Sequence, residues 1–295
     1  MTYSIVARDR HVGELGAAVQ SAWYGTAAGV LLVERGVGAA VSQAMGERAF
    51  AHHGLELLAG GSTPASAVAA VMDRAQSRTL SQIALIDIDS PAAAHTGGDC
   101  IPHAGHHIGV DCAAQANMMT NPGVPDAMVA AFESTTGDLA DRLLAALDAA
   151  QRLGGDFRGM QSSGLIVRTA DRSAPEWNGT VIDVRVDDHA EPLRELRRLV
   201  GLNRVQHSMN EPLRRLAAGD PEAAVSVARH LHDQAPGDTN VRMRLGLALL
   251  AAGDAEGKEI LTRLAAVDER WLTYAQRSLE RYGVDPVPLL ERLRH

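Results

Sequence analysis

The second residue of the chain could do chemistry by itself. The sequence opens Met1-Thr2, so removal of the initiator methionine would leave Thr2 at the amino terminus. Its hydroxyl would then lie beside its own free amine, which makes a nucleophile with a built-in base. The pKa of an α-amino group is about 7.7–8.0, so this amine can take the hydroxyl proton near neutral pH, directly or through a water. The alternative is that Thr2 simply starts a β-hairpin.

A nucleophile of this kind needs polar neighbours, and the ends of nearby strands offer them. Gln20 and Ser21 end the second predicted strand, and Gln43 ends the fourth. Because the ends of adjacent strands converge in space, we expect these side chains to lie near Thr2. The backbone N–H of Gly46, at the turn into the first long helix, is the predicted oxyanion donor. The glutamines could instead be edge residues with ordinary hydrogen bonds.

A glycine-rich loop at 154–163 supplies a second set of polar side chains. It reads Gly-Gly-Asp-Phe-Arg-Gly-Met-Gln-Ser-Ser and precedes a predicted strand. It lacks the lysine and the glycine spacing of a phosphate-binding P-loop. The forked guanidinium of Arg158 suits a substrate carboxylate. The loop could also be an ordinary connection between a helix and a strand. The predicted substrate-binding residues are Asn117, Asp156, Arg158, Gln161 and Ser162.

Composition excludes several classes of protein. The formal net charge of −8 argues against a nucleic-acid partner, because binding to phosphates needs a basic face. The only lysine is Lys258, so no lysine earlier in the chain can act as a base. The histidines and the two cysteines, Cys100 and Cys112, lack the spacing of a metal site, and we expect the cysteines to be reduced. We therefore predict no metal and no cofactor.

The sequence also gives no sign of export or of a membrane. It has no basic segment followed by a long apolar run, and no stretch of about 18 apolar residues. We expect a cytoplasmic protein with no membrane partner, and the sequence leaves a homo-oligomer open.

The order of predicted elements indicates an α+β fold. Strands come in runs separated by pairs of helices, which favours antiparallel sheets covered by helices. Two such sheets packed face to face would form a four-layer αββα sandwich over residues 1–200. The predicted strands cover 2–8, 14–21, 28–33, 37–43, 82–88, 92–96, 103–109, 111–119, 161–168 and 181–186. The predicted helices cover 47–58, 64–76, 125–133, 139–153 and 191–202.

Residues 204–295 form a different region, for which we predict a small all-α domain. The five residues Leu-Ala-Ala-Gly-Asp at 216–220 recur at 250–254, 34 positions later. That period, with Gly-Asp between helical runs, is typical of tetratricopeptide-like helix pairs. We expect about two repeats.

Several stretches of the first 200 residues resemble the DUF1028 family. They include Thr2 to Asp9, Gly13 to Ser21, Gly54 to Leu58, Ala114 to Asn117, the loop 154–163, and Arg185 to His189. The resemblance implies an N-terminal nucleophile hydrolase, a superfamily whose fold is the αββα sandwich. It also implies that residues 204–295 correspond to an extension described in this family as peptidoglycan-binding.

Together these observations predict an amidohydrolase that cleaves an amide bond of a small molecule or peptide through Thr2. The alternative is a non-catalytic binding or adaptor protein. In either case the C-terminal domain is predicted to bind a peptide or a cell-wall fragment.

Overall fold

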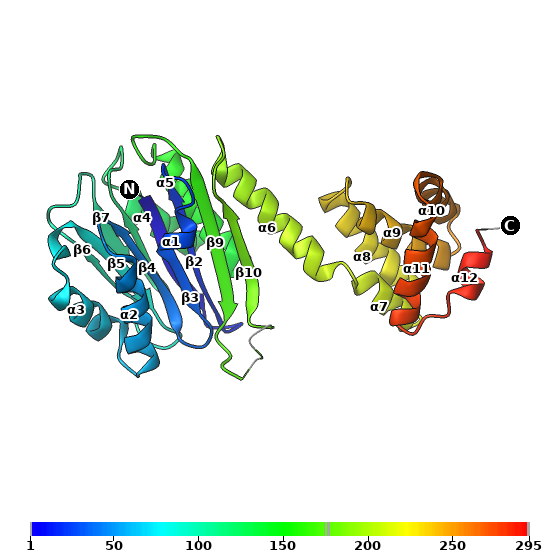
Figure 1. The fold of residues 1–295 in the computed structure, drawn as a ribbon, viewed down its shortest axis with the longest axis horizontal. Coiled ribbons are helices and arrows are strands. Elements are labelled where there is room, and N and C mark those ends of the chain that lie inside the picture. Colours follow the sequence, from blue (N-terminus) through cyan, green and yellow to red (C-terminus); the bar gives the residue numbers. More distant parts are fainter. Residues whose placement is uncertain (1, 174, 176–177, 294–295) are drawn as a thin grey trace. The chain divides into compact units, whose positions relative to one another are not determined.

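The computed structural model of the protein describes residues 2–173, 175 and 178–293. Contacts divide the chain into two compact units, one ending at Val200 and the other beginning at Gly201. The first unit contains all the described strands and the second is entirely helical (Figure 1). No helix in the described part of the chain is both long and apolar enough to cross a membrane.

The first unit is built on two antiparallel sheets, which confirms the α+β prediction. One sheet has six strands in the order β10-β9-β2-β1-β8-β7, and the other has four in the order β3-β4-β5-β6. In the larger sheet β1 (Thr2–Asp9) pairs with β2 (Glu14–Ser21), which places Thr2 opposite Ser21. The other strands are β3 (Leu31–Glu34), β4 (Gly38–Ala44), β5 (Ser81–Ile86), β6 (Ala93–Thr96), β7 (Gly105–Ile108), β8 (Cys112–Ala116), β9 (Ser162–Thr169) and β10 (Thr180–Val186).

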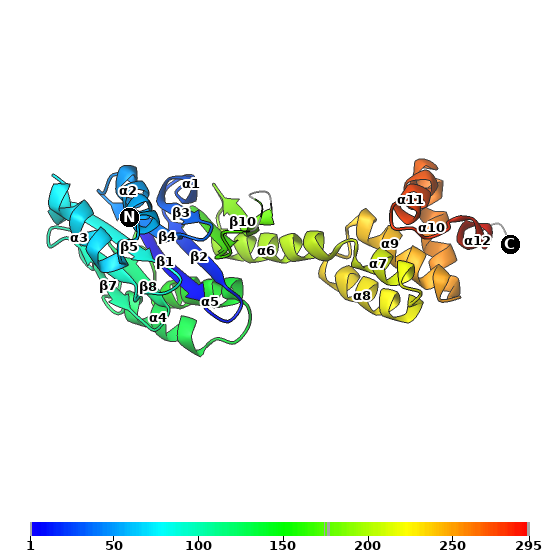
Figure 2. The ribbon, with the colours of Figure 1, turned by 90° about the horizontal axis from the view of Figure 1, so that it is seen from below.

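Three hydrophobic clusters hold this unit together. One includes Ile5 and the helices that contact the six-stranded sheet, a second includes Val6 and residues of both sheets, and a third lies under the helices on the four-stranded sheet. Successive residues of β1 thus serve different clusters, as strand alternation requires. The helices on the larger sheet are α4 (Val124–Ser134) and α5 (Leu139–Arg152), and those on the smaller sheet are α2 (Arg48–Ala59) and α3 (Pro64–Arg74) (Figures 1 and 2).

Local sequence signals explain several element boundaries. The side chain of Thr63 accepts a hydrogen bond from the N–H of Ser66, and Pro64 fills the first position of α3. The close packing of α5 on β2 depends on Gly16, where a Cβ would come within 2.9 Å of Leu143. A larger residue at this position would push the helix off the sheet.

Three predicted strands differ from the structure, and the one predicted at 111–119 is only β8. The strand predicted at 28–33 begins as a helical turn, α1 (Ala27–Val30), in which the N–H of Gly29 donates to the carbonyl of Thr26, and only β3 is extended. This turn carries the chain from one sheet to the other. The strand predicted at 103–109 is only β7, so His103 precedes it and does not share a strand face with His107. Cys100 and Cys112 are free and buried, and burial raises the pKa of the Cys112 thiol to about 12.

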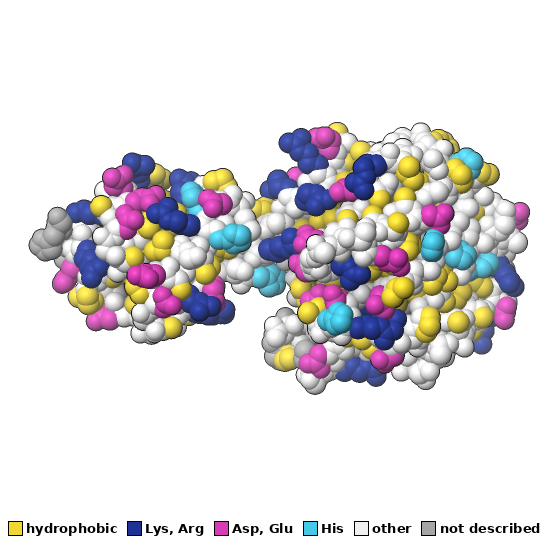
Figure 3. Space-filling view, turned by 180° about the vertical axis from the view of Figure 1, so that it is seen from behind, with side chains coloured by type: hydrophobic (Ala, Val, Ile, Leu, Met, Phe, Trp, Pro, Cys, Tyr) yellow, Lys and Arg dark blue, Asp and Glu magenta, His cyan; other side chains and the backbone are white. Residues whose placement is uncertain are grey.

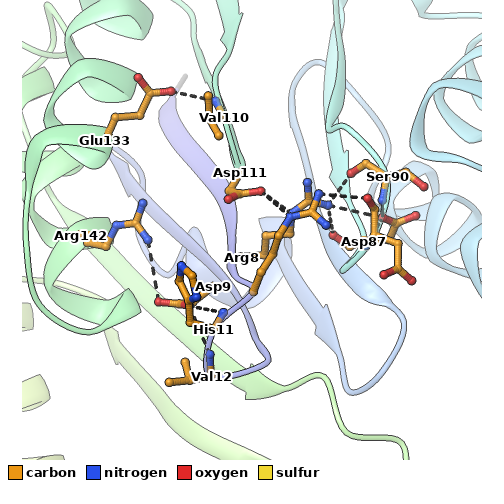
Figure 4. A network of polar contacts seen from close by, with 12 residues as sticks. Arg8, Asp9, His11, Val12, Asp87, Ser90, Val110, Asp111, Glu133 and Arg142 are labelled. Atoms are coloured by element: carbon orange, nitrogen blue, oxygen red, sulfur yellow. Dashed lines mark hydrogen bonds and ion pairs between the residues drawn. The ribbon is translucent and has the colours of Figure 1, made fainter.

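The end of β1 away from Thr2 is fastened by ion pairs (Figure 4). The Nε of Arg8 donates to Asp111 Oδ1 at 2.7 Å, and its Nη1 lies 3.6 Å from Asp87 Oδ1. Arg10 also donates to Asp111, at 3.0 Å. Burial alone would raise the pKa of Asp111, but the hydrogen bonds from the two arginines outweigh it, and the pKa is lowered.

The second unit consists of helices, and two of its helix junctions are equivalent. After α7 and again after α9 the chain passes through a glycine with positive φ, Gly219 at 76° and Gly253 at 80°. An aspartate then caps the next helix: Asp220 accepts from the N–H of Ala223, and Asp254 from that of Glu256. The recurring five residues therefore mark a recurring helix junction. The helices are α6 (Pro192–Ser208), which begins in the first unit, α7 (Glu211–Ala217), α8 (Pro221–Gln234), α9 (Thr239–Ala251), α10 (Ala255–Val267), α11 (Arg270–Arg281) and α12 (Val287–Glu291).

Acidic and basic side chains are interspersed on the face of the protein that Figure 3 displays. Histidines lie among them on this face. Within residues 2–173, 175 and 178–293, no three His, Cys, Asp or Glu side chains are grouped so that they could hold a metal ion.

Candidate active site

Thr2 lies at the wall of a cavity of about 280 Å³ in the first unit. It is only 2% exposed, and its Oγ1 donates a hydrogen bond to Ser21 Oγ at 3.1 Å. Gln43 and Gly46 line the same cavity. The structure thus brings together four of the residues that the sequence predicts to be catalytic. The predicted removal of Met1 lies outside the described residues and stays a prediction.

Buried amides hold the backbone of Thr2 in place. Its carbonyl oxygen accepts hydrogen bonds from the N–H of Asn117 at 3.2 Å and from Gln43 Nε2 at 3.1 Å. Both side chains also donate to Gln82 Oε1, Asn117 at 2.7 Å and Gln43 at 2.9 Å. Asn117 therefore positions the backbone of Thr2 but does not line the cavity. The sequence did not single out Gln82. It lies at the end of a predicted strand, as Gln43 does, and this was the signal that could have found it.

Gln20 lies on the other side of β2 from this cavity. It is paired with Tyr3, whose side chain packs in the cluster under α4 and α5. Its amide is fully buried, and neither side-chain atom finds a hydrogen-bond partner in the part of the chain that the structure describes. Strand alternation is the reason: if Ser21 faces the cavity, Gln20 faces away.

The N–H of Gly46 is already engaged. It donates to the carbonyl of Gln43 at 3.1 Å, in a turn where Ala44 takes a positive φ of 64°. Such a conformation is uncommon for a residue with a side chain, and it often marks a functional site. An oxyanion would have to share the Gly46 donor. In the first turn of α2 the N–H of Phe50 donates to the carbonyl of Glu47 at 3.1 Å, and Arg48 at the start of this helix lines the cavity.

The polar loop residues support the cavity without lining it. The fork of Arg158 is occupied by Asp156, with Nη2–Oδ2 at 2.7 Å and Nε–Oδ1 at 3.1 Å. Its guanidinium lies 6.0 Å from the ring centroid of Trp23. Burial of the Asp156 carboxylate, which is 3% exposed, requires such a partner. Arg158 therefore holds the loop together and is not the open anion site that its residue type suggests.

Gln161 and Ser162 fasten the wall of the cavity. Ser162 Oγ donates to the carbonyl of Trp23 and accepts from the N–H of Thr26 at 3.2 Å, so it fixes the loop that follows β2. The N–H of Gln161 donates to the carbonyl of Ser21 at 2.9 Å, and its side chain bonds Asp188. Both residues therefore act on the cavity indirectly, by holding Ser21 and the loop that follows β2.

The loop at 23–26 brings two exposed aromatic rings to the cavity. Trp23 is 60% exposed and Tyr24 is 70% exposed, and both line the cavity. A chain with only 3% aromatic residues places two of them side by side in water here. Large exposed apolar groups of this kind are typical of ligand contacts. The signal in the sequence was that both rings lie within three residues of Ser21.

Arg48 was also missed, and it changes the electrostatics of the site. Among the described residues that line the cavity it is the one with a charge at neutral pH. Its guanidinium packs on Gly29, where a Cβ would come within 2.2 Å of Nη2. No hydrogen bond or ion pair ties it to any described residue. An arginine at a helix start opposes the helix dipole, and this unfavourable placement was the available signal.

Comparisons with known proteins agree on one family. Residues 2–196 match the model of DUF1028, a family of unknown function. The crystal structure of protein SPO2555 from Silicibacter pomeroyi, whose title gives the same family, is similar to this chain with a TM-score of 0.60 and 30% sequence identity. The match covers 67% of this chain and 87% of the Silicibacter protein. No curated protein matches the chain. The chain therefore belongs to the DUF1028 family.

Proposed function

We propose that the protein is an amidohydrolase that uses Thr2, freed by removal of Met1, as an N-terminal nucleophile. The observation that carries this proposal is the position of Thr2: a threonine at the start of a central strand, on the wall of a cavity, with its backbone held by Gln43 and Asn117. Two antiparallel sheets with helices on their outer faces fit the four-layer αββα sandwich of the N-terminal nucleophile hydrolases. We propose that the reaction takes place in the cytoplasm.

The reaction begins when Thr2 Oγ1 attacks the carbonyl carbon of the amide. The α-amine of Thr2 takes the hydroxyl proton, and the tetrahedral intermediate forms. The same proton then passes to the leaving nitrogen, so an amine departs and an ester to Thr2 remains. Water, deprotonated by the amine, hydrolyses this ester and restores the hydroxyl. Ser21 Oγ, at 3.1 Å from Thr2 Oγ1, holds the hydroxyl in position.

Arg48 points to the substrate class. Among the described residues the cavity is lined by one guanidinium and by no carboxylate, which favours an acyl group that carries a carboxylate. The aromatic rings of Trp23 and Tyr24 provide an apolar contact for the rest of the substrate. The expected substrates are therefore small acidic amides or peptides with an acidic residue beside the cleaved bond.

One observation favours a non-catalytic binding protein as the second candidate. The N–H of Gly46 is committed to Gln43, so the predicted oxyanion donor is not free. In this reading the cavity binds an anionic ligand without cleaving it, and the second unit is a tetratricopeptide-like adaptor that binds a peptide or a peptidoglycan fragment.

The intact mass of untagged protein tests the nucleophile. We expect a species lighter by one methionine that gains the whole mass of an alkyl β-lactone when the lactone ring opens onto Thr2. Thr2→Ala should abolish the adduct, whereas Thr2→Ser should retain it. Full retention of Met1 with no adduct would exclude the enzyme and leave the binding protein.

A matched pair of substrates tests the role of Arg48. Glutaryl-4-nitroanilide carries a carboxylate that butyryl-4-nitroanilide lacks. We expect kcat/KM to favour the glutaryl compound by at least tenfold, roughly the effect of one charge-assisted contact, and Arg48→Met to remove this preference. Equal loss of activity on both compounds would show that Arg48 does not recognise the carboxylate.

A further inference from the structure

The second unit contains a cavity of about 370 Å³ that none of the preceding chemistry uses. It lies between α7, α9 and α11, next to the end of α6. Its lining includes Arg244, Arg277 and Arg281, and no acidic residue of the described part of the chain lines it. The cavity therefore has a positive wall, although the protein as a whole has a net charge of −8.

Arg244 is the unusual member of this set, because it is only 5% exposed. Its Nε and Nη2 both donate to Asn210 Oδ1, at 3.2 and 2.7 Å, and its Nη1 donates to the carbonyl of Asn240 at 3.2 Å. These acceptors are neutral. A guanidinium has five N–H donors, so donors remain on both terminal nitrogens for a ligand.

A buried charge without a counter-ion is costly, and proteins usually pair it. Within the described residues no carboxylate forms an ion pair with Arg244. Arg277, on α11, is exposed and is paired with Glu280 at 2.7 Å. Arg281 is exposed and has no ion pair with a described residue. The charge that would balance Arg244 is thus not supplied by this part of the chain.

The rest of the lining indicates that the missing anion is part of a larger molecule. Met209, Leu213 and the rings of Tyr274 and Tyr282 give the cavity apolar surface. Gln206 and Asn240 add amide groups that can pair with a peptide backbone. The guanidinium lies over the ring of Tyr274, 6.0 Å from the ring centroid, so an aromatic ring borders the charged group.

We propose that this cavity binds the carboxylate of a peptide, with Arg244 as the buried anchor and Arg281 as the second cation at its mouth. Arginine is suited to this task because its planar fork matches both oxygens of a carboxylate. The site does not depend on Thr2, so it stands whether or not the protein is a hydrolase.

The test uses the full-length protein and the Nε–Hε signals of arginine in ¹H–¹⁵N spectra. The signal that disappears in Arg244→Met identifies Arg244. We expect acetyl-Ala-Leu with a free terminal carboxylate to shift this signal in a saturable way, and its terminal amide to leave it unchanged. Acetyl-Ala-Asp-amide, which carries a carboxylate only on its side chain, decides whether the carboxylate comes from a chain end or a side chain.

Two further variants keep the proposal falsifiable if Arg244→Met disturbs the unit. Arg281→Gln should weaken binding about tenfold, as expected for loss of one charge-assisted contact. Arg270→Gln, an exposed arginine outside the cavity that is paired with Asp268, should leave binding unchanged. Absence of any shift at 50 mM peptide, or an equal response to inorganic phosphate, would overturn the assignment of a peptide carboxylate site.

Discussion

Two arginines among the described residues are more than nine-tenths buried, and they are treated in opposite ways. Arg8, 3% exposed, is enclosed by Asp87 and Asp111 and by the carbonyl oxygens of Asp87 and Ser90. Arg244, 5% exposed, donates hydrogen bonds to an asparagine side chain and a backbone carbonyl, and its guanidinium lies over the ring of Tyr274. Arg8 belongs to a buried network of ion pairs and hydrogen bonds, whereas Arg244 lines a cavity.

This difference in acceptors separates a guanidinium that has a structural role from one that is available to a ligand. Arg8 joins β1 of the larger sheet to the residues that follow β5 and precede β8, so its charge is used for fastening. Arg244 has N–H donors left over, and no carboxylate in the described part of the chain forms an ion pair with it. The two arginines are buried to a similar degree, and they differ in whether their acceptors are charged or neutral. Substitutions in both units test whether the charge of the acceptor separates a structural arginine from one that binds a ligand.

The largest expected effect is that of Arg8→Met. It leaves Asp111 and Asp87 without their buried partner, which costs about 3 kcal/mol in the free energy of unfolding of the first unit. Native-state hydrogen exchange read by mass spectrometry measures each unit separately in the full chain.

Arg10→Met is the matched control for this change. Arg10 donates to the same carboxylate but is 46% exposed, so its loss should cost less than about 1 kcal/mol. Equal costs for the two variants would show that burial of Arg8 adds nothing.

The second prediction concerns pH. The pKa of Asp111 is lowered in the folded protein, so its contribution to stability is present above the pKa of an unfolded aspartate, about 3.9. This contribution is lost as the pH falls through the lowered pKa. The difference in unfolding free energy between the protein and Asp111→Asn should therefore shrink between pH 5 and pH 2. A difference that stays constant with pH would contradict the role given to the two arginines.

The third prediction extends the comparison to an uncharged group. Gln20 is buried with both side-chain polar atoms unpaired, so Gln20→Met should raise the unfolding free energy of the first unit by about 1 kcal/mol. Gln43→Met should lower it, because it breaks the bonds to Thr2 and Gln82. Urea denaturation of both variants measures the contrast, and a destabilised Gln20→Met would indicate a partner that the fold does not reveal.

The smallest effect is expected for Arg244→Met. No carboxylate is orphaned by this change, and a buried charge is removed, so the unfolding free energy of the second unit should change by less than about 1 kcal/mol. Hydrogen exchange in α9 and α11 measures it. A loss as large as that of Arg8→Met would mean that Arg244 is a structural residue, and the comparison would fail.

Much of the architecture could be predicted from local patterns. Apolar runs on either side of a turn mark β1 and β2, Thr63-Pro64 marks the start of α3, and the repeated Gly-Asp pairs mark helix junctions. These features depend on neighbours in the chain, so the sequence contains them directly. The segment 28–33 differs in kind, because the passage between two sheets imposed a helical turn on residues that read as a strand.

The candidate site was predictable only in part. Thr2, Ser21 and Gln43 meet because strand ends converge, which topology alone implies. The direction in which Gln20 points, the pairing of Arg158 with Asp156 and the access of Arg48 to the cavity depend on register and on packing between distant segments.

The sequence by itself determined which residue types and strand ends are available near Thr2, because these follow from order along the chain. The tertiary structure decided which charges are neutralised and which face a cavity. Arg8 and Arg244 have the same side-chain chemistry, and folding brings different acceptors to them. Asp111, 103 residues away in the sequence, makes Arg8 part of a structural ion pair. Asn210, 34 residues away, leaves the charge of Arg244 available to a ligand.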